Sequence, residues 1–273
     1  MKKLFLMLMA GMLVTACASK AKTEQAAEEP AKKVLVLYYS VTNTTKQMAE
    51  YIQQKTGADI EAIAPVNAYP SDYSELIKRS QEEIQGNVLP ELKPLAHNVA
   101  DYDIIFLGYP IWMGTYALPL KTVIASGALN GKTVVPFCTS GSSGIKQSVN
   151  DLLKAASGIQ VPECVGVRSS LMNLMPAAVD RVLISLGLIE GENEALADYS
   201  AQQAPTAEET AIFDAAISTY DMMKCTKAVS DGSRKTSNGT DYKFVGEANG
   251  AQMDIYITKE NGDAAPYFTA VDR

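Results

Sequence analysis

Residues 33–45 read KVLVLYYSVTNTT, a continuous apolar run followed at once by a loop crowded with hydroxyl groups. Apolar runs without polar alternation are typical of strands buried on both faces, as in parallel sheets covered by helices. Such runs recur at residues 103–108 and 133–138, and more weakly at 161–167, whereas residues 59–63 alternate as an edge strand does. The opening stretch therefore predicts the first strand of a covered parallel sheet.

Helical patterns separate these strands. They cover Thr44–Thr56, Asp72–Gln85, Tyr116–Ile124, Ile145–Ala156 and Ala177–Leu188. Regular alternation of strand and helix predicts an α/β fold with right-handed crossovers. We therefore expect a doubly wound, five-stranded parallel sheet in the order 2-1-3-4-5 over residues 33–188.

The composition changes after this segment. Residues 189–205 are acidic and small and are interpreted as a linker, and Thr206 is a typical N-cap for a following helix. Beyond that helix, β-rich segments flank three Asn-Gly pairs, at Asn238-Gly239, Asn249-Gly250 and Asn261-Gly262. Because Asn-Gly tolerates the positive φ angles of a type I′ turn, each pair predicts a hairpin. Residues 206–273 should thus form a small α+β module, a helix covering a four-stranded antiparallel meander.

The N-terminus is typical of an export signal. Two lysines precede an apolar run, Leu4–Val14, which is too short to span a bilayer as a helix. Residues 13–17 read LVTAC and resemble a bacterial lipobox, in which Cys17 is lipidated; an ordinary signal peptide with an incidental Cys is the alternative. We expect a lipoprotein signal at 1–16, a flexible tether at 17–32, and a lipid-anchored protein of the bacterial cell envelope.

Composition excludes several classes of function. Among 273 residues, 31 acidic groups outnumber 24 basic ones, for a net charge of −7, so nucleic acid is not an expected partner. The single histidine, His97, argues against a histidine-based zinc site or a Ser–His–Asp triad, and no metal site is predicted. Redox or group-transfer chemistry would therefore need a borrowed cofactor.

Ligands of open parallel sheets bind beyond the carboxyl ends of the strands. The first such loop, residues 40–45, places four hydroxyls and an Asn at a helix N-terminus, where unpaired N–H groups and the helix dipole favour an anion such as phosphate. It contains no Gly-x-Gly-x-x-Gly and no Gly-Lys-Ser/Thr, which disfavours dinucleotide and nucleoside triphosphate sites. An N-cap with surplus threonines is the alternative interpretation.

Two further loops complete the predicted site. Residues 108–115 (GYPIWMGT) hold the only Trp of the chain, which in a loop either covers the core or forms a platform for a flat ligand. Residues 139–144 (TSGSSG) are small and rich in backbone N–H groups that can approach a planar ring.

Together the motifs resemble those of short bacterial flavodoxins. The resemblance covers residues 33–188 and rests on Ser-x-Thr-x-x-Thr at 40–45, Tyr-Pro-x-Trp at 109–112 and the Ser/Gly-rich stretch at 139–144. It implies non-covalently bound FMN. By position, the phosphate would be held by Ser40, Thr42, Asn43, Thr44 and Thr45; the ring would be flanked by Pro110, Ile111, Trp112 and Met113; and its other edge would meet Thr139, Ser140, Gly141 and Gly144.

Two residues depart from the family pattern. Asn43 stands where glycine is usual, and Met113 stands where many relatives carry a second aromatic. Asn tolerates left-handed φ. The ring face left open by Met113 would either admit a quinone-type acceptor or weaken flavin binding. The resemblance implies electron transfer or an FMN-dependent oxidoreductase, with an enzyme favoured, no obligatory catalytic side chain and an unidentified redox partner. The alternative is a binding or scaffold lipoprotein that has lost flavin and binds a partner or glycan through its C-terminal module.

Overall fold

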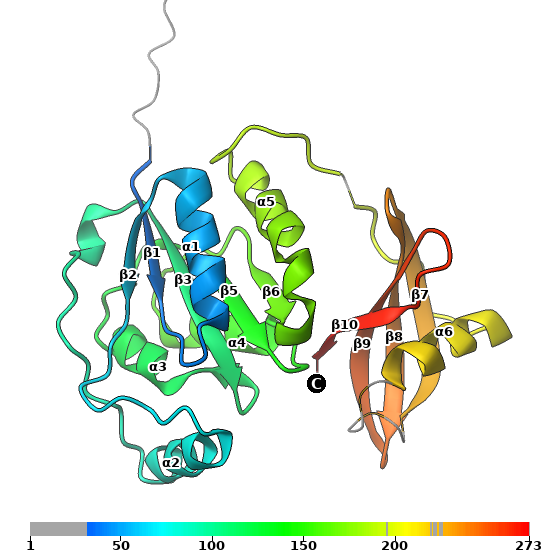
Figure 1. Ribbon diagram of the computed structural model, residues 1–273, viewed down its shortest axis with the longest axis horizontal. Coiled ribbons are helices and arrows are strands. Elements are labelled where there is room, and N and C mark those ends of the chain that lie inside the picture. The colour runs from blue at the N-terminus through cyan, green and yellow to red at the C-terminus, as the bar shows by residue number, and fades with distance from the viewer. Residues whose placement is uncertain (1–31, 195, 219, 221–222, 224–225, 273) are drawn as a thin grey trace, which may run out of the picture. The chain divides into compact units, whose positions relative to one another are not determined.

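The computed structural model describes residues 32–194, 196–218, 220, 223 and 226–272. The expected signal peptide, most of the tether and Cys17 lie outside these residues. Within them the chain forms a parallel sheet layered with helices, followed by an antiparallel sheet with one helix (Figure 1).

The parallel sheet has the expected order. Its strands are β1 (Val34–Tyr38), β2 (Asp59–Ala62), β3 (Ile104–Trp112), β5 (Thr133–Ser140) and β6 (Val165–Arg168). They pair as β2-β1-β3-β5-β6, and a two-residue strand, β4 (Thr115–Tyr116), pairs with β3 alone. This is the doubly wound order 2-1-3-4-5 once β4 is set aside, so the predicted fold class is confirmed.

Helices cover both faces of this sheet. They are α1 (Thr44–Thr56), α2 (Tyr73–Gln85), α3 (Leu118–Ala125), α4 (Lys146–Ala155) and α5 (Met175–Ser185), with short 3₁₀ turns at Val99–Asp101 and Ser169–Leu174. Along β1, Leu35 and Leu37 pack in a core with α3 and α4, while Val36 packs in a second core with α1 and α5. Burial on both faces is why the run is apolar without alternation.

The C-terminal module is the expected helix on a meander. Strands β7 (Lys227–Thr236), β8 (Gly239–Ala248), β9 (Ala251–Glu260) and β10 (Tyr267–Asp272) pair in sequence order. Helix α6 (Ala207–Ile217) starts with a capping box between Thr206 and Glu209. Its Phe213 packs against Phe244 with ring centroids 5.0 Å apart, so the helix closes one face of the sheet.

Only one Asn-Gly pair forms the predicted type I′ turn. Asn249 and Gly250 have φ of 51° and 76°, as that turn requires, and they join Ala248 to its partner Ala251. The other two pairs also lie at hairpins, as predicted, but their turns are not of type I′. The first turn consists of Ser237 and Asn238, with Gly239 already paired in β8, and the last connection is longer, with positive φ at its glycine but not at its asparagine. Register in the sheet, rather than the dipeptide, selects the turn residues there.

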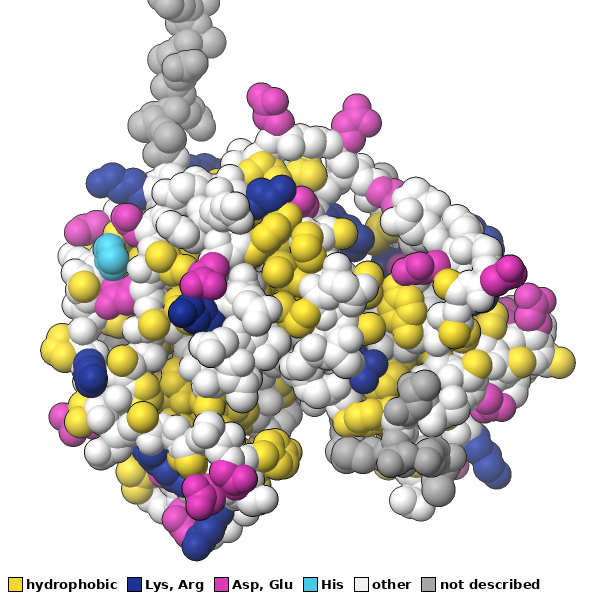
Figure 2. All heavy atoms as spheres, viewed as in Figure 1, with side chains coloured by type: hydrophobic (Ala, Val, Ile, Leu, Met, Phe, Trp, Pro, Cys, Tyr) yellow, Lys and Arg dark blue, Asp and Glu magenta, His cyan; other side chains and the backbone are white. Residues whose placement is uncertain are grey.

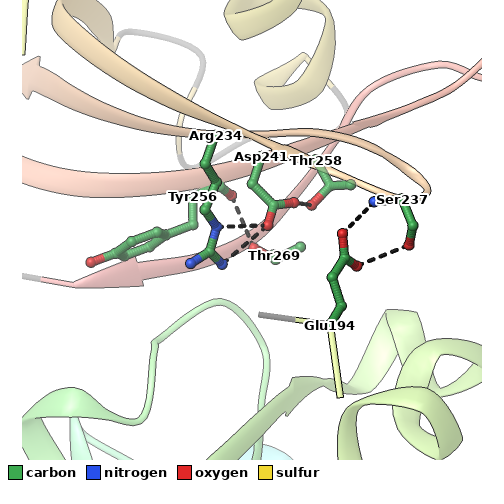
Figure 3. A network of polar contacts seen from close by, with 7 residues as sticks. All are labelled: Glu194, Arg234, Ser237, Asp241, Tyr256, Thr258 and Thr269. Atoms are coloured by element: carbon green, nitrogen blue, oxygen red, sulfur yellow. Dashed lines mark hydrogen bonds and ion pairs between the residues drawn. The ribbon is translucent and has the colours of Figure 1, made fainter. Parts of the chain in front are cut away.

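The segment interpreted as a linker is partly attached to the C-terminal sheet. Gln203 and Asp231 of β7 exchange two backbone hydrogen bonds of 3.0 and 2.9 Å. Glu194 accepts hydrogen bonds from the backbone N–H and the hydroxyl of Ser237, as Figure 3 shows. The same figure shows Arg234 and Asp241 paired at 3.1 Å on the sheet. One acidic side chain of the segment, that of Glu194, therefore makes specific contacts with the module.

Two surface properties complete the description. In Figure 2, basic and acidic side chains are interspersed on the face in view, which presents no dense patch of one sign. Within the described part of the chain, no helix combines the length and apolar character needed to cross a bilayer. Cys138 and Cys164 are free thiols, and Cys138 is buried.

Candidate functional site

The first loop adopts a left-handed turn directly before α1. Asn43 has φ 62° and ψ 0°, and its side chain makes no capping hydrogen bond, although its carbonyl oxygen accepts the Gln47 N–H at 3.0 Å. The left-handed conformation explains why glycine is usual at this position and why Asn can replace it. Because no side chain caps the helix here, its first N–H groups are left to meet an anion.

Threonine hydroxyls converge on this turn. The Thr42 and Thr44 Oγ1 atoms lie 3.3 Å apart, whereas Thr45 is buried and its Oγ1 lies 2.7 Å from the Oγ1 of Thr139. Ser40, partly exposed, precedes them at the end of β1. The structure thus brings the predicted phosphate residues together and ties them to the start of the third loop. The Thr45 and Thr139 hydroxyls bond to each other across that junction.

The second loop is a tight hairpin. Residues 110–112 continue β3, and Met113 and Gly114, with φ of 49° and 85°, form a two-residue turn into β4. Positive φ at both positions is characteristic of a type I′ turn, which rarely accepts methionine. Met113 is also 45% exposed. A strained, exposed methionine at a predicted ligand loop is a feature that often marks a functional site.

Trp112 lies in the core beneath this hairpin. It is 8% exposed and meets Tyr39 and Tyr69 edge to face, with centroid distances of 5.6 and 5.0 Å. Burial raises the pKa of the Tyr39 hydroxyl well above its usual range, so this aromatic cluster is uncharged at neutral pH. Trp112 and Met113 border a cavity on the α2 side. The predicted contact of Trp112 with a ring stays a prediction.

The second and third loops lie side by side because β3 pairs with β5. In that pairing Pro110 is the partner of Thr139. Between the loops lies a cavity of about 640 Å³, called here the ring cavity, and Ile111 and Met113 line it together with residues 140–144. Trp112 is not among its lining residues. Its size is that of ordinary cofactor sites.

The third loop is held by hydrogen bonds of its own and by the C-terminal strand. The Ser140 hydroxyl donates to the Ser143 carbonyl at 2.6 Å. The Gly144 N–H donates to the Val271 carbonyl, and the Val271 N–H donates to the Ser142 carbonyl, both at 2.9 Å. The Gly144 amide is thus engaged by β10, whereas a Cβ added to Gly141 would meet open space. Of the two glycines, Gly141 is the more accessible to a ligand.

Sequence reasoning missed several residues of the ring cavity. Tyr73, Tyr220 and Met223 line it, as do Val271 and Asp272 at the end of the chain. Tyr73 is 76% exposed at the start of α2, and an aromatic residue directly after an N-cap Asp was a readable signal. No signal marks Val271 in the sequence, because its partner Ser143 is more than a hundred residues away.

A carboxylate borders the ring cavity. Burial raises the pKa of the Asp272 carboxyl above its usual range, although Lys146 opposes the shift. Arg168, at the end of β6, donates to the Gly141 carbonyl at 3.0 Å and to the Phe268 carbonyl at 2.6 Å. No group of three potential metal ligands occurs among the residues that the structure describes. The site therefore combines the hydroxyl groups of the first loop, a helix terminus and a wide cavity with the Asp272 carboxyl group at the cavity's border.

Comparisons with known proteins found a matching family and several similar solved structures. The sequence profile of a flavodoxin family matches residues 33–177. A flavoprotein from Bacteroides eggerthii is 33% identical, aligned over 55% of this chain and 97% of its own, with a TM-score of 0.46. A flavoprotein from Bacteroides uniformis is 27% identical over 55% and 99% of the two chains, with a TM-score of 0.48.

A flavoprotein from Lactobacillus acidophilus, whose structure was solved in complex with FMN, is also 27% identical. It aligns over 55% of this chain and 99% of its own, with a TM-score of 0.43. The profile match confirms the expected resemblance, and it supports FMN as the cofactor that the resemblance implied.

Proposed function

The chain belongs to the flavodoxin family, and on that premise we propose that it binds FMN between its three loops and acts in electron transfer or as an FMN-dependent oxidoreductase. The observation that carries the proposal is the meeting of the first and third loops through the Thr45–Thr139 contact of 2.7 Å. This contact joins the first loop to the start of the third loop, whose residues 140–144 line the ring cavity.

The first loop fits a phosphate group. Its left-handed turn at Asn43 leaves α1 uncapped by a side chain, and the Thr42 and Thr44 hydroxyls stand beside it. These donors are neutral, so a dianionic phosphate would be held by hydrogen bonds and the helix terminus rather than by a cation. Hydrogen bonds to charged groups contribute roughly 1.5–3 kcal/mol each, which is enough for tight binding.

The ring cavity fits a flat heterocycle. Met113 supplies a soft thioether on one side, and the Gly141 backbone can approach a ring edge closely. Tyr73 is exposed at the cavity, where it would contact an approaching small acceptor. We propose a quinone-type acceptor, because such a flat apolar molecule matches a cavity bordered by Tyr73, Ile111 and Met113.

The chain itself needs no acid–base residue for this chemistry. FMN, when bound, supplies reversible one- and two-electron transfer. The residues on the first loop anchor the phosphate, and the third loop presents backbone dipoles to the ring edge. Burial raises the pKa values of Tyr109 and Cys138, which lie on adjacent strands below the loops, further above neutrality.

The experiment is spectroscopic. Purified protein, or apo-protein mixed with FMN and then desalted, should show the absorbance of bound flavin, which should bleach on reduction and return on addition of a soluble quinone. A colourless protein that takes up no FMN would contradict the proposal and favour a scaffold. Flavin that is bound and reduced but not reoxidised by the quinone would contradict only the choice of acceptor.

We also propose that the protein is exported and anchored by a lipid on Cys17. The support is the order of features in the sequence: two lysines, the apolar run Leu4–Val14 and then LVTAC at 13–17. Labelling of bacterial cells with radioactive fatty acid should mark the wild-type protein and not Cys17→Ser. Label on both proteins, or on neither, would contradict the anchor.

A further inference from the structure

We propose that the C-terminal module is part of the flavin site, because strand β10 holds the third loop in its binding conformation and Val271 is the positioning residue. The proposal rests on the function proposed above and assigns a role to the part of the chain that lies beyond the matched residues 33–177. Its support is a set of contacts between β10 and the loop.

The first support is backbone pairing. Val271 and Ser143 form a parallel bridge, made by the Val271 N–H to the Ser142 carbonyl and the Gly144 N–H to the Val271 carbonyl, both at 2.9 Å. β10 is an edge strand whose other side pairs with β9. Unpaired edges are templates for further strand pairing. Here the third loop is the segment that occupies the edge at Val271.

Arg168 forms a second tie. Its Nε donates to the Gly141 carbonyl at 3.0 Å, and its Nη1 donates to the Phe268 carbonyl at 2.6 Å. The guanidinium carbon also lies 3.5 Å from the centre of the Phe268 ring. One side chain therefore joins the beginning of the loop to the beginning of β10, while Val271 holds the end of the loop.

The close approach at Gly144 gives a third support. A Cβ added there would lie 2.1 Å from the Asp272 Oδ1 atom, so a side chain at this position would displace the Asp272 carboxylate. Val271 and Asp272 also line the ring cavity beside Met113. The end of β10 therefore forms part of the wall against which a bound ring would sit.

The contacts between β10 and the third loop should affect both the affinity for FMN and the electronics of its ring. A loop of small residues and glycines is flexible by itself, and ordering it on binding would cost conformational entropy. Strand β10 lowers that cost, because it fixes the loop before the ligand arrives. The backbone dipoles of a fixed loop also keep a constant orientation toward the ring, and such dipoles tune its electronics.

The test uses the full chain with two matched substitutions. Val271→Pro removes the N–H that bonds to Ser142 and leaves the bonding to β9 intact, because that N–H points toward the loop. Val271→Ala trims the same side chain but keeps the N–H. Arg168→Met removes the second tie without touching the backbone of β10, and it keeps the test valid if the proline variant does not fold.

We expect Val271→Pro and Arg168→Met to bind FMN about tenfold more weakly than Val271→Ala, the equivalent of one hydrogen bond. Their flavin midpoint potential should shift from the wild-type value, and amide hydrogen exchange in residues 139–145 of the apo-protein should be faster. A variant that matches Val271→Ala in affinity, potential and loop exchange would overturn the proposal.

Failure of the proposed function would look different. The wild-type chain would then take up no FMN, whatever the substitution at Val271. In that case amide hydrogen exchange of the third loop alone decides whether β10 orders this loop. Faster exchange in Val271→Pro than in Val271→Ala supports the ordering, and unchanged exchange overturns it.

Discussion

The two ends of the proposed site differ in how far apart their residues lie along the chain. At the phosphate end, residues 40–45 are consecutive and follow directly from β1 into α1. At the ring end, the second and third loops meet through strand pairing, and Val271 arrives from the last strand. On the proposed function, the difference teaches that anion binding would be encoded locally, whereas the environment of the ring would depend on the assembled fold and the C-terminal module.

The largest expected effect on FMN affinity comes from removing hydroxyl groups at the proposed phosphate end. The pair Thr44→Ala and Thr45→Ala should weaken FMN binding by about 100-fold or more, because donors to a charged group contribute roughly 1.5–3 kcal/mol each. Titration of apo-protein followed by flavin fluorescence measures the change. The control pair Thr44→Ser and Thr45→Ser keeps both hydroxyls and should bind within a few-fold of wild type. Equal affinity in the alanine and serine pairs would remove this loop from the site.

A pH-dependent effect tests the module that supports the ring end. Burial, together with the nearby Glu209 carboxylate, raises the pKa of Asp231 to about 6 from an ordinary value of 3.8. The ionised side chain therefore destabilises the folded module increasingly as the pH rises from about 4 to 6. Asp231→Asn should raise the free energy of unfolding by about 2 kcal/mol above pH 6, and this gain should vanish below pH 4.

Denaturant unfolding at several pH values checks this. Far-UV circular dichroism follows the whole chain, while the fluorescence of Trp112, the only tryptophan, reports the parallel-sheet part. Asp231→Glu, which keeps the charge, is the control. A gain that is equal at pH 4 and pH 8 would show that ionisation of Asp231 is not the cause.

Backbone conformation at Asn43 sharpens the account of the phosphate end. Asn43→Val should weaken FMN binding by about tenfold, because a left-handed conformation costs a side chain of this kind roughly 1–2 kcal/mol. Asn43→Gly, the matched control, should bind as wild type or slightly better, since glycine adopts φ 62° without strain. If both variants bind alike, the turn conformation does not limit binding.

The smallest expected effect is a gain at the ring end. Met113→Trp should tighten FMN binding by a few-fold, because a stacked aromatic contributes about 0.5–1.5 kcal/mol beyond area burial. Met113→Leu, of similar volume and also apolar, should leave the affinity nearly unchanged. Isothermal titration of the three proteins measures the difference. Weaker binding by the tryptophan variant would mean that Met113 does not face the ring.

The sequence predicted the elements better than their contacts. Helix α1 was expected at Thr44–Thr56 and is found there, because an apolar face and the hydroxyl-rich turn before it are both local signals. The hairpin at Met113-Gly114 was missed, since methionine is an unusual residue for its left-handed turn. The burial of Trp112 was an open alternative that composition could not decide, because its partners Tyr39 and Tyr69 lie far away in the chain.

The same limit explains the C-terminal module. Its helix was predicted from the N-cap Thr206 and its four strands from β-rich segments flanking Asn-Gly pairs, and these signals are local. The pairing of Val271 with Ser143 involves backbone atoms that every residue carries, so no side-chain pattern could reveal it. Backbone pairing between distant segments at an open strand edge therefore could not be predicted from the sequence.

The most direct test of the central claim compares FMN with riboflavin, which has the same ring without the phosphate. Apo-protein titrated with each should bind FMN at least about 100-fold more tightly, because only FMN reaches the donors of residues 40–45. The advantage should shrink to a few-fold in the Thr44→Ala and Thr45→Ala pair. Equal affinities for the two flavins in the wild-type chain, or no binding of either, would contradict the account.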